Sequence, residues 1–119
     1  MRIAIDIDHT ITANPAFFAA FIENQLDGGN EIHVLTGRTS SPEGDHESPQ
    51  DRVEQLAQIG IARYTRLVQI TRLIQHPDIG IGKGQYCWNN KIDMIFEDDI
   101  LYVREIRRIS PSTQAFLIM

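Results

Sequence analysis

Short apolar runs and segments with helical spacing alternate along the whole chain, and this alternation restricts the fold more than any other feature. Apolar runs of about four to eight residues bounded by turns are typical of strands, whereas apolar residues spaced three or four apart are typical of helices. Such an alternation predicts a parallel sheet with right-handed crossovers and helices on both faces. The sequence therefore predicts an α/β fold: a Rossmann-like, three-layer α/β/α domain with a mainly parallel five-stranded sheet. The predicted strands lie at residues 3–7, 31–36, 67–70, 92–96 and 114–119, and the predicted helices lie at 15–27, 51–60, 83–90 and 100–109.

The composition is that of one globular domain spanning residues 1–119. The chain is 42% hydrophobic and 23% charged, and its net charge of -5 argues against general affinity for nucleic acid or for an anionic membrane. The single cysteine, Cys87, permits no internal disulfide. No segment resembles a signal peptide or approaches the roughly 20 apolar residues of a membrane span. A cytoplasmic location is expected.

Polar side chains follow three of the predicted strands at the point where each strand ends. Asp6 and Asp8 end the first strand two positions apart, so both side chains point to one face. Thr36 ends the second strand, and Glu97 and Asp98 end the fourth. Because sites in open parallel sheets form beyond the carboxyl ends of the strands, we expect these side chains to share one crevice. Carboxylates gathered there require a compensating cation, and Mg²⁺ with oxygen ligands fits best.

Two further features suit a phosphate group beside that cation. Thr36 and the backbone amides near Gly37 are placed to donate hydrogen bonds to phosphate oxygens. Lys83 enters a predicted helix after a glycine-rich turn and supplies a positive charge for the same group. A metal, two carboxylates and a lysine in one crevice indicate phosphoryl transfer.

The chain resembles the phosphohydrolases of the haloacid dehalogenase (HAD) superfamily over nearly its whole length. Residues 6–10 (DIDHT) stand where that family has its DxD motif, and Thr36, in a Thr-Gly-Arg sequence, matches the second motif. Lys83 matches the third motif, and the pair Glu97-Asp98 matches the fourth. The intervals between these motifs have no room for a cap domain. The resemblance therefore implies a single HAD-like hydrolase domain without a substantial cap.

The resemblance implies an enzyme, a Mg²⁺-dependent phosphatase that hydrolyses phosphate monoesters. Asp6 would attack phosphorus and form an aspartyl-phosphate, and Asp8 would act as the general acid and base. Mg²⁺ would be held by Asp6, the backbone carbonyl of Asp8 and the acidic pair Glu97 and Asp98, with Asp98 preferred as the direct ligand of the two. The phosphate-binding residues implied in this way are Thr36, Gly37 and Lys83.

The resemblance leaves several points open. His9 stands where the family usually has glycine, so either a contact with substrate or a weakened motif would explain it. Lys91 rivals Lys83 as the motif lysine, but Lys83 leaves a whole helix before the fourth strand and is preferred. The substrate is a nucleotide, a sugar phosphate or a phosphorylated macromolecule. A homo-oligomer could supply a lid over the open site.

Two functions without catalysis remain as alternatives. One is a binding module that keeps the fold but not the reaction, for which His9 in place of glycine is the signal. The other is a phospho-receiver signalling domain. In that class the acceptor aspartate follows the third strand, whereas a threonine follows the strand at 67–70 here. Turnover of an aryl phosphate with Mg²⁺ separates the enzyme from both alternatives.

Overall fold

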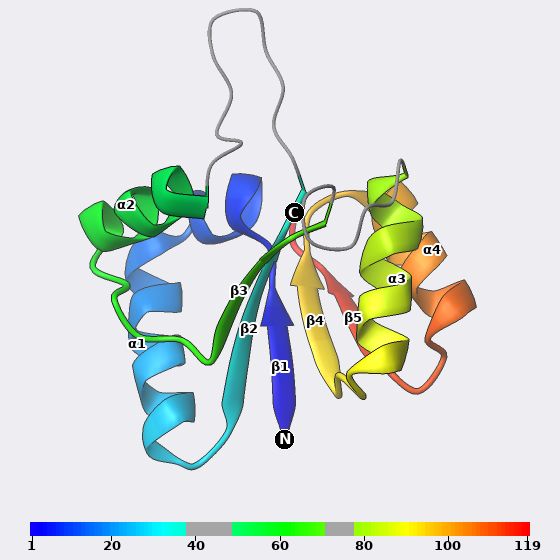
Figure 1. Ribbon diagram of the computed structural model, residues 1–119, viewed down its shortest axis with the longest axis horizontal. Coiled ribbons are helices and arrows are strands. Elements are labelled where there is room, and N and C mark those ends of the chain that lie inside the picture. The colour runs from blue at the N-terminus through cyan, green and yellow to red at the C-terminus, as the bar shows by residue number, and fades with distance from the viewer. Residues whose placement is uncertain (38–48, 71–77) are drawn as a thin grey trace, which may run out of the picture.

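The structure is a computed structural model that describes residues 1–37, 49–70 and 78–119, and it confirms the predicted α/β fold (Figure 1). The strands of the described residues are β1 (Arg2–Ile5), β2 (Glu31–Thr36), β3 (Arg66–Gln69), β4 (Met94–Glu97) and β5 (Gln114–Leu117). They form one sheet in the order β3-β2-β1-β4-β5, and every neighbouring pair is parallel. In the central strand, Ile3 pairs with Ile32 on one side and with Met94 on the other.

Helices cover both faces of the sheet and complete the three layers. They are α1 (Pro15–Asp27), α2 (Pro49–Ile59), α3 (Ile79–Asn89) and α4 (Ile100–Ile109). The first two cover one face and the last two cover the other (Figure 1). Ile3 and Ile5 belong to an apolar cluster with Phe18 of α1, whereas Ala4 belongs to a second cluster with Tyr86 of α3. Successive strand residues point to opposite faces, so β1 contributes to both apolar layers.

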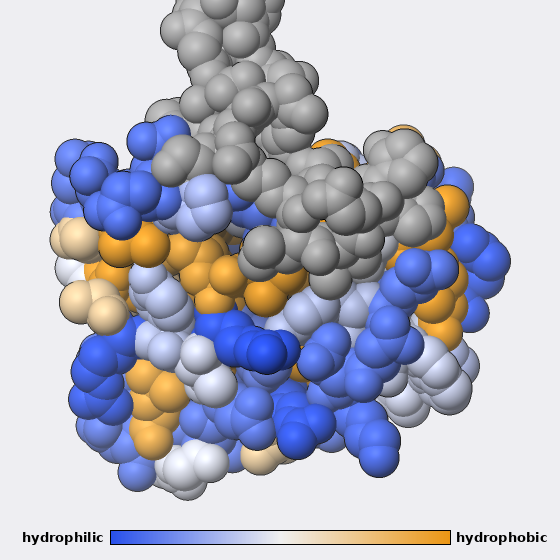
Figure 2. All heavy atoms as spheres, viewed as in Figure 1, coloured by the Kyte–Doolittle hydropathy of each residue, from blue (hydrophilic) through white to orange (hydrophobic). Residues whose placement is uncertain are grey.

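Hydrophilic side chains cover most of the face seen in Figure 2, and hydrophobic side chains reach that surface in smaller areas. This distribution agrees with apolar residues gathered between the sheet and its helices. None of the helices in the described ranges combines the length and the apolar character needed to cross a membrane.

The helix predicted to start at Lys83 begins earlier, at Ile79, so the glycine-rich segment before Lys83 is helical and not a flexible turn. The carboxylate of Asp78 caps this helix by accepting a backbone N–H of the first turn at 3.0 Å. The glycines allow α3 and α4 to pack closely. A Cβ atom on Gly80 would lie 3.1 Å from the ring of Tyr102. Close helix packing thus outweighs the low helix propensity of glycine here.

The strand order turns back at β1, which leaves a crevice beyond the carboxyl ends of β1 and β4. The chain runs outward from β1 to β2 and β3, and then returns to β4 on the other side of β1. Open α/β sheets with such a turning point place their ligand sites there. After β1 the backbone makes one wide turn, η1 (Ile7–Ile11), with non-helical dihedral angles at Asp8 and His9. Asp6 lies just before this turn, at the crevice.

Candidate metal centre

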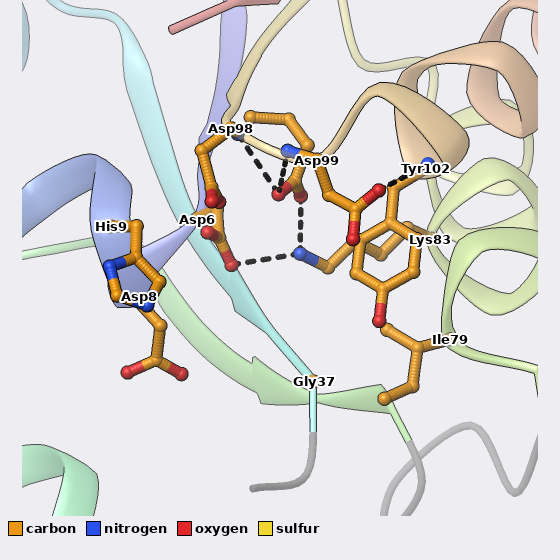
Figure 3. A pocket seen from close by; sticks show the side chains of 10 residues that line it. Asp6, Asp8, His9, Gly37, Ile79, Lys83, Asp98, Asp99 and Tyr102 are labelled. Carbon is orange, nitrogen blue, oxygen red and sulfur yellow. Dashed lines mark hydrogen bonds and ion pairs between the residues drawn. The ribbon is translucent and has the colours of Figure 1, made fainter. Parts of the chain in front are cut away.

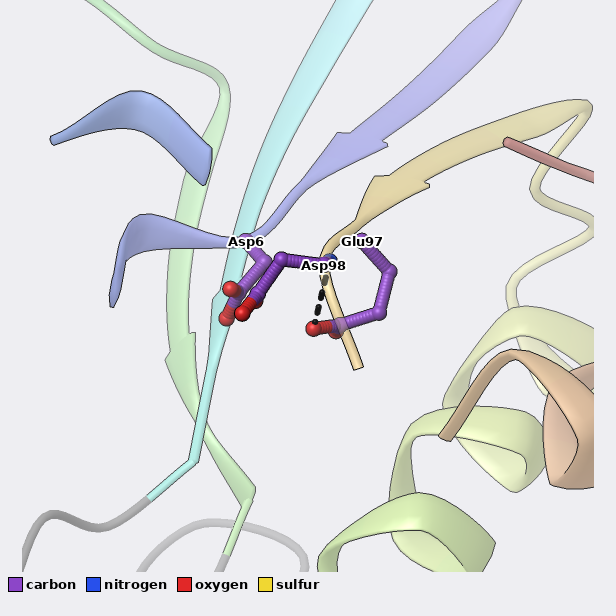
Figure 4. A group of neighbouring side chains, drawn as sticks. All are labelled: Asp6, Glu97 and Asp98. Atoms are coloured by element: carbon purple, nitrogen blue, oxygen red, sulfur yellow. Dashed lines mark hydrogen bonds between the residues drawn. The ribbon is translucent and has the colours of Figure 1, made fainter. Parts of the chain in front are cut away.

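Three carboxylates from two neighbouring strand ends converge at the crevice (Figure 4). Asp6 follows β1, Glu97 ends β4 and Asp98 comes next in the chain. Each offers one oxygen atom, and these atoms lie within 4.8 Å of one another. Asp6 and Glu97 are buried, whereas Asp98 is half-buried. An all-oxygen set of this size suits a hard cation such as Mg²⁺.

Lys83 of α3 reaches across and binds two of these carboxylates (Figure 3). Its Nζ atom donates a hydrogen bond of 2.8 Å to Oδ1 of Asp6 and a second one to Oε2 of Glu97. Nζ also lies 5.3 Å from the ring centre of Tyr102, which is within the range of a cation–π contact. Lys83 is 1% exposed, so these groups make up its immediate surroundings.

The cluster holds more negative charge than Lys83 can offset. Burial lowers the pKa of the Lys83 ammonium, but the carboxylates of Asp6 and Glu97 outweigh burial and hold that pKa above its ordinary value. Burial raises the pKa of Asp6, and it raises the pKa of Glu97 to about 8 although Lys83 opposes it. With all three acids ionised, three carboxylates face one ammonium. A divalent cation would remove this excess, and the residues therefore fit such an ion.

The hydrogen bonds distinguish the members of the acidic group. Both oxygens of Glu97 have partners: Oε2 accepts from Lys83, and Oε1 accepts from the backbone N–H of Asp98 at 3.1 Å. Both oxygens of Asp6 have partners too: Oδ1 accepts from Lys83, and Oδ2 accepts from the hydroxyl of Thr10 at 3.3 Å. Oδ1 of Asp98 shares that hydroxyl at 3.4 Å. The oxygens that Asp6 and Asp98 turn towards Thr10 are thus bound by a longer contact than those of Glu97, which positions its neighbours.

The carboxylate of Asp8 points away from the cluster and towards α2 (Figure 3). It is bound by both terminal nitrogens of Arg52, at 3.2 Å from Nη1 to Oδ1 and 2.9 Å from Nη2 to Oδ2. The Arg52 side chain is completely buried, whereas that of Asp8 is 41% exposed. Among the described residues, the group able to hold a metal through side chains comprises Asp6, Glu97 and Asp98 without Asp8.

A cavity of about 330 Å³ opens over these residues. Gly37 lines it beside Ile79, and a Cβ atom on Gly37 would lie 2.8 Å from the Ile79 side chain. Thr36 is fully buried, and its hydroxyl donates to the backbone carbonyl of Gly37 at 3.2 Å. The described lining therefore includes Gly37 but not Thr36: Asp6, Asp8, His9, Gly37, Ile79, Lys83, Glu97, Asp98, Asp99 and Tyr102.

His9 and Lys91, two residues left open by the sequence, lie at opposite ends of the sheet. His9 lines the cavity and has a φ of 61°, the left-handed region that glycine favours. Its backbone N–H donates to Oγ1 of Thr12 at 2.9 Å, which supports the turn. Lys91 follows α3 and lines a separate cavity with Trp88. Of the two candidate lysines, Lys83 is the one beside the carboxylates.

Sequence reasoning missed Thr10, Arg52 and Tyr102 as members of this region. Arg52 shares the buried side of α2 with Leu56, one turn further on. The sequence signal for Arg52 was therefore a charged residue at a position that helical spacing assigns to the apolar side of α2. Thr10 stands within the predicted motif, but its bridge between Asp6 and Asp98 depends on the tertiary structure. Tyr102 gave no signal, because α4 meets α3 only in the folded chain.

No protein-family model matches the chain, and no curated protein matches it. One solved structure that matches is that of a protein from the universal stress protein family from Burkholderia pseudomallei. The two chains are 15% identical, and the alignment covers 98% of this chain and 94% of the other with a TM-score of 0.49.

This finding contradicts the family that was inferred from the motifs, because the matched structure comes from the universal stress protein family and not from the HAD superfamily. On this finding the predicted HAD membership is wrong. The predictions of an enzyme, a phosphatase and an aspartyl-phosphate rested on that membership and lose this basis with it.

The motif resemblance has a physical origin in the fold. A parallel sheet with this strand order brings the residues after β1, β2 and β4 to one edge, whatever reaction or ligand the edge serves. The resemblance also assigned Asp8 a role beside Asp6, whereas the structure pairs the Asp8 carboxylate with Arg52. Acidic and hydroxyl residues at strand ends, with a lysine in α3, therefore indicate which edge of the sheet gathers the candidate residues, and not what they do.

Proposed function

We propose that this chain is a binding module without catalytic activity that holds Mg²⁺ and, beside it, a phosphate-bearing ligand. The observation that carries the proposal is the convergence of Asp6, Glu97 and Asp98, whose oxygens lie within 4.8 Å of one another. When all three are ionised, their charge exceeds the single positive charge of Lys83, and a divalent cation offsets the excess. Carboxylate oxygens favour Mg²⁺, Ca²⁺ and Mn²⁺ over softer metals.

Asp6 and Asp98 would be the direct ligands in this proposal. Their oxygens turned towards Thr10 are held by one shared hydroxyl at 3.3 and 3.4 Å, which a cation could replace without leaving a buried acceptor unpaired. Glu97 would remain bound to Lys83 and to the backbone N–H of Asp98. It would thereby keep the Asp98 main chain in place.

The ligand class follows from what surrounds the cation. Mg²⁺ commonly takes one or two carboxylates from the protein and completes its shell with phosphate oxygens and water. An ammonium has three N–H groups, and two of those of Lys83 are engaged by described carboxylates. Lys83 and Gly37 both line the cavity. Thr36 would act through Gly37, because its hydroxyl donates to the Gly37 carbonyl.

Isothermal titration calorimetry with MgCl₂ and then with inorganic phosphate tests the proposal. We expect one Mg²⁺ per chain, and phosphate binding that is lost in EDTA. Replacing a residue that hydrogen-bonds a metal ligand typically weakens metal binding about 10–100-fold. Asp98→Asn changes a proposed direct ligand and should weaken Mg²⁺ binding by at least this much. Asp27→Asn, the same change at an exposed position of α1, is the matched control and should leave binding unchanged. Equal Mg²⁺ affinity in wild type and Asp98→Asn would contradict the site.

We also propose a cytoplasmic location. Cys87 is a free thiol buried in the apolar layer between the sheet and α3. A free thiol agrees with a reducing compartment. The net charge of -5 argues against nucleic acid or an anionic membrane as a general partner.

A further inference from the structure

We propose that Arg52 determines the specificity of this site, because it withdraws the charge of Asp8 from the cavity and so lets an anion bind beside one divalent cation. The inference rests on the proposed function and assigns a role that neither the motifs nor the carboxylate cluster indicates. It concerns the balance between cation and anion binding, and not the position of the cation.

The geometry fixes Arg52 firmly. Its two terminal nitrogens face the two oxygens of Asp8 at 3.2 and 2.9 Å, the parallel arrangement that a planar guanidinium forms with a carboxylate. Nη1 also donates to Oε1 of Gln55 at 2.8 Å, and Nη2 donates to the backbone carbonyl of Gly37 at 3.4 Å. Arg52 therefore joins α2 to the ends of β1 and β2 around the cavity.

The two partners differ in burial, and this difference indicates a role in binding. Arg52 is completely enclosed, while the Asp8 side chain is 41% exposed and lines the cavity together with Asp6 and Asp98. A buried ion pair often contributes little to stability compared with apolar residues of the same size. Here, however, one partner reaches the cavity, so the pair sets the charge that a ligand meets there.

Without Arg52, the carboxylate of Asp8 would lose this bidentate counter-charge in a cavity that is also lined by Asp6, Glu97 and Asp98. That charge would attract a second cation and repel a phosphate group. Asp8 lines the same cavity as the proposed cation ligands, and a unit charge on the order of 10 Å from a bound ion, at the effective dielectric constant near a protein surface, changes affinity by about tenfold. With Arg52 in place, the charge excess of the cavity stays close to what one divalent ion offsets.

Calorimetry on Arg52→Gln, Asp8→Asn and the double variant tests the inference, with Mg²⁺ alone and then inorganic phosphate at saturating Mg²⁺. For Arg52→Gln we expect Mg²⁺ to bind about tenfold more tightly and phosphate about tenfold more weakly. Asp8→Asn should do the opposite. The double variant should return both dissociation constants towards wild type, because both charges are gone.

A structural role for Arg52 predicts a different result. Both constants would then weaken in Arg52→Gln, and the double variant would restore neither, which would overturn the inference. Arg52→Lys keeps the charge and should retain the wild-type ratio of the two constants. If Arg52→Gln does not fold, Asp8→Asn decides alone, since Asp8 is partly exposed: unchanged or weaker phosphate binding overturns the inference.

The same titrations separate this inference from the proposed function. If wild type binds no Mg²⁺, the proposed function fails, and the effect of Asp8→Asn on phosphate binding in EDTA still tests the role of Arg52. A gain in phosphate affinity there supports that role. If neither wild type nor Asp8→Asn binds either ion, both ideas are wrong.

Discussion

The ammonium of Lys83 lies 2.8 Å from Oδ1 of Asp6, although the two residues are 77 positions apart in the chain. Lys83 is 1% exposed and Asp6 is 5% exposed, so water screens their interaction little. The same nitrogen binds Glu97. This arrangement joins α3 to the ends of β1 and β4 and fixes the positions of Asp6, which we propose as a cation ligand, and of Glu97.

Replacing this lysine should destabilise the fold when no divalent cation is present. We expect Lys83→Met to lower the free energy of unfolding by about 3–5 kcal/mol in EDTA, because Asp6 and Glu97 lose their buried counter-charge. Added Mg²⁺ should recover part of the loss. Urea unfolding measures both effects. Lys91→Met, an exposed change at the opposite end of the sheet, should stay within about 0.5 kcal/mol, and equal losses in the two variants would contradict this assignment.

The packing of α3 against α4 depends on a glycine. A Cβ atom at Gly84 would lie 3.0 Å from Cβ of Ile109 and 3.2 Å from the backbone oxygen of Glu105. Because a helix backbone cannot yield easily, Gly84→Ala should cost about 1–3 kcal/mol in thermal or urea unfolding. Gly28→Ala is the control: φ is -80° there and the nearest atom would lie 3.4 Å away. A stabilised Gly84→Ala variant would show that the helices can move apart.

The buried thiol of Cys87 should be unreactive in the folded protein. Burial raises its pKa to about 12, above the ordinary value of 9.0. Between pH 9 and pH 12 the folded state therefore retains the thiol proton, whereas the unfolded state loses it. The free energy of unfolding should fall as the pH rises above about 9, and this group should contribute roughly 1.4 kcal/mol per pH unit to the loss. Cys87→Ala should show a shallower loss over the same pH range. Ellman's reagent at pH 8 should label the thiol only after unfolding in urea, and rapid labelling without urea would contradict its burial.

Asp99 acts as a helix cap rather than as a cation ligand. Its Oδ1 atom accepts from the backbone N–H groups of Leu101 and Tyr102 at 2.9 and 3.4 Å. Asp99→Ala should therefore cost about 0.5–2 kcal/mol in urea unfolding, whereas Asp99→Asn keeps an acceptor and should cost less. Mg²⁺ affinity should change little in Asp99→Asn. A loss as large as that of Asp98→Asn would make Asp99 a ligand.

The sequence predicted the fold, and it predicted that the candidate residues would meet at one edge of the sheet, because both inferences depend on patterns that are local in the chain. The strand ends at Asp6, Thr36 and Glu97 could be placed on one edge as soon as the alternation of strands and helices indicated a parallel sheet. Lys83 could be placed there too, since it precedes the fourth strand by one helix. These inferences require the order of elements and no side-chain contacts.

Other parts of the site depend on contacts that no local pattern records. A polar amphipathic helix does not show that Arg52 turns inward to Asp8, 44 positions earlier in the chain. The glycines before Lys83 predicted a flexible turn, but the structure shows a helix there. The close approach of Tyr102, which requires a glycine at Gly80, is a tertiary contact that the local sequence does not show. The motif resemblance failed in the same way. It identified residue types at strand ends, whereas the pairing of Asp8 with Arg52 appears only in the folded chain.

The most direct test of the cation site is the paramagnetic effect of Mn²⁺ on the amide resonances of the ¹⁵N-labelled protein. At a substoichiometric amount, Mn²⁺ in place of Mg²⁺ should broaden the resonances of Ile7 and Asp98 first and spare those of Lys91 and Asp93 at the other end of β4. Excess Mg²⁺ should reverse the broadening, and Asp98→Asn should abolish it. Broadening centred on Asp93, or none near Asp98 in the wild type, would contradict the proposed metal centre.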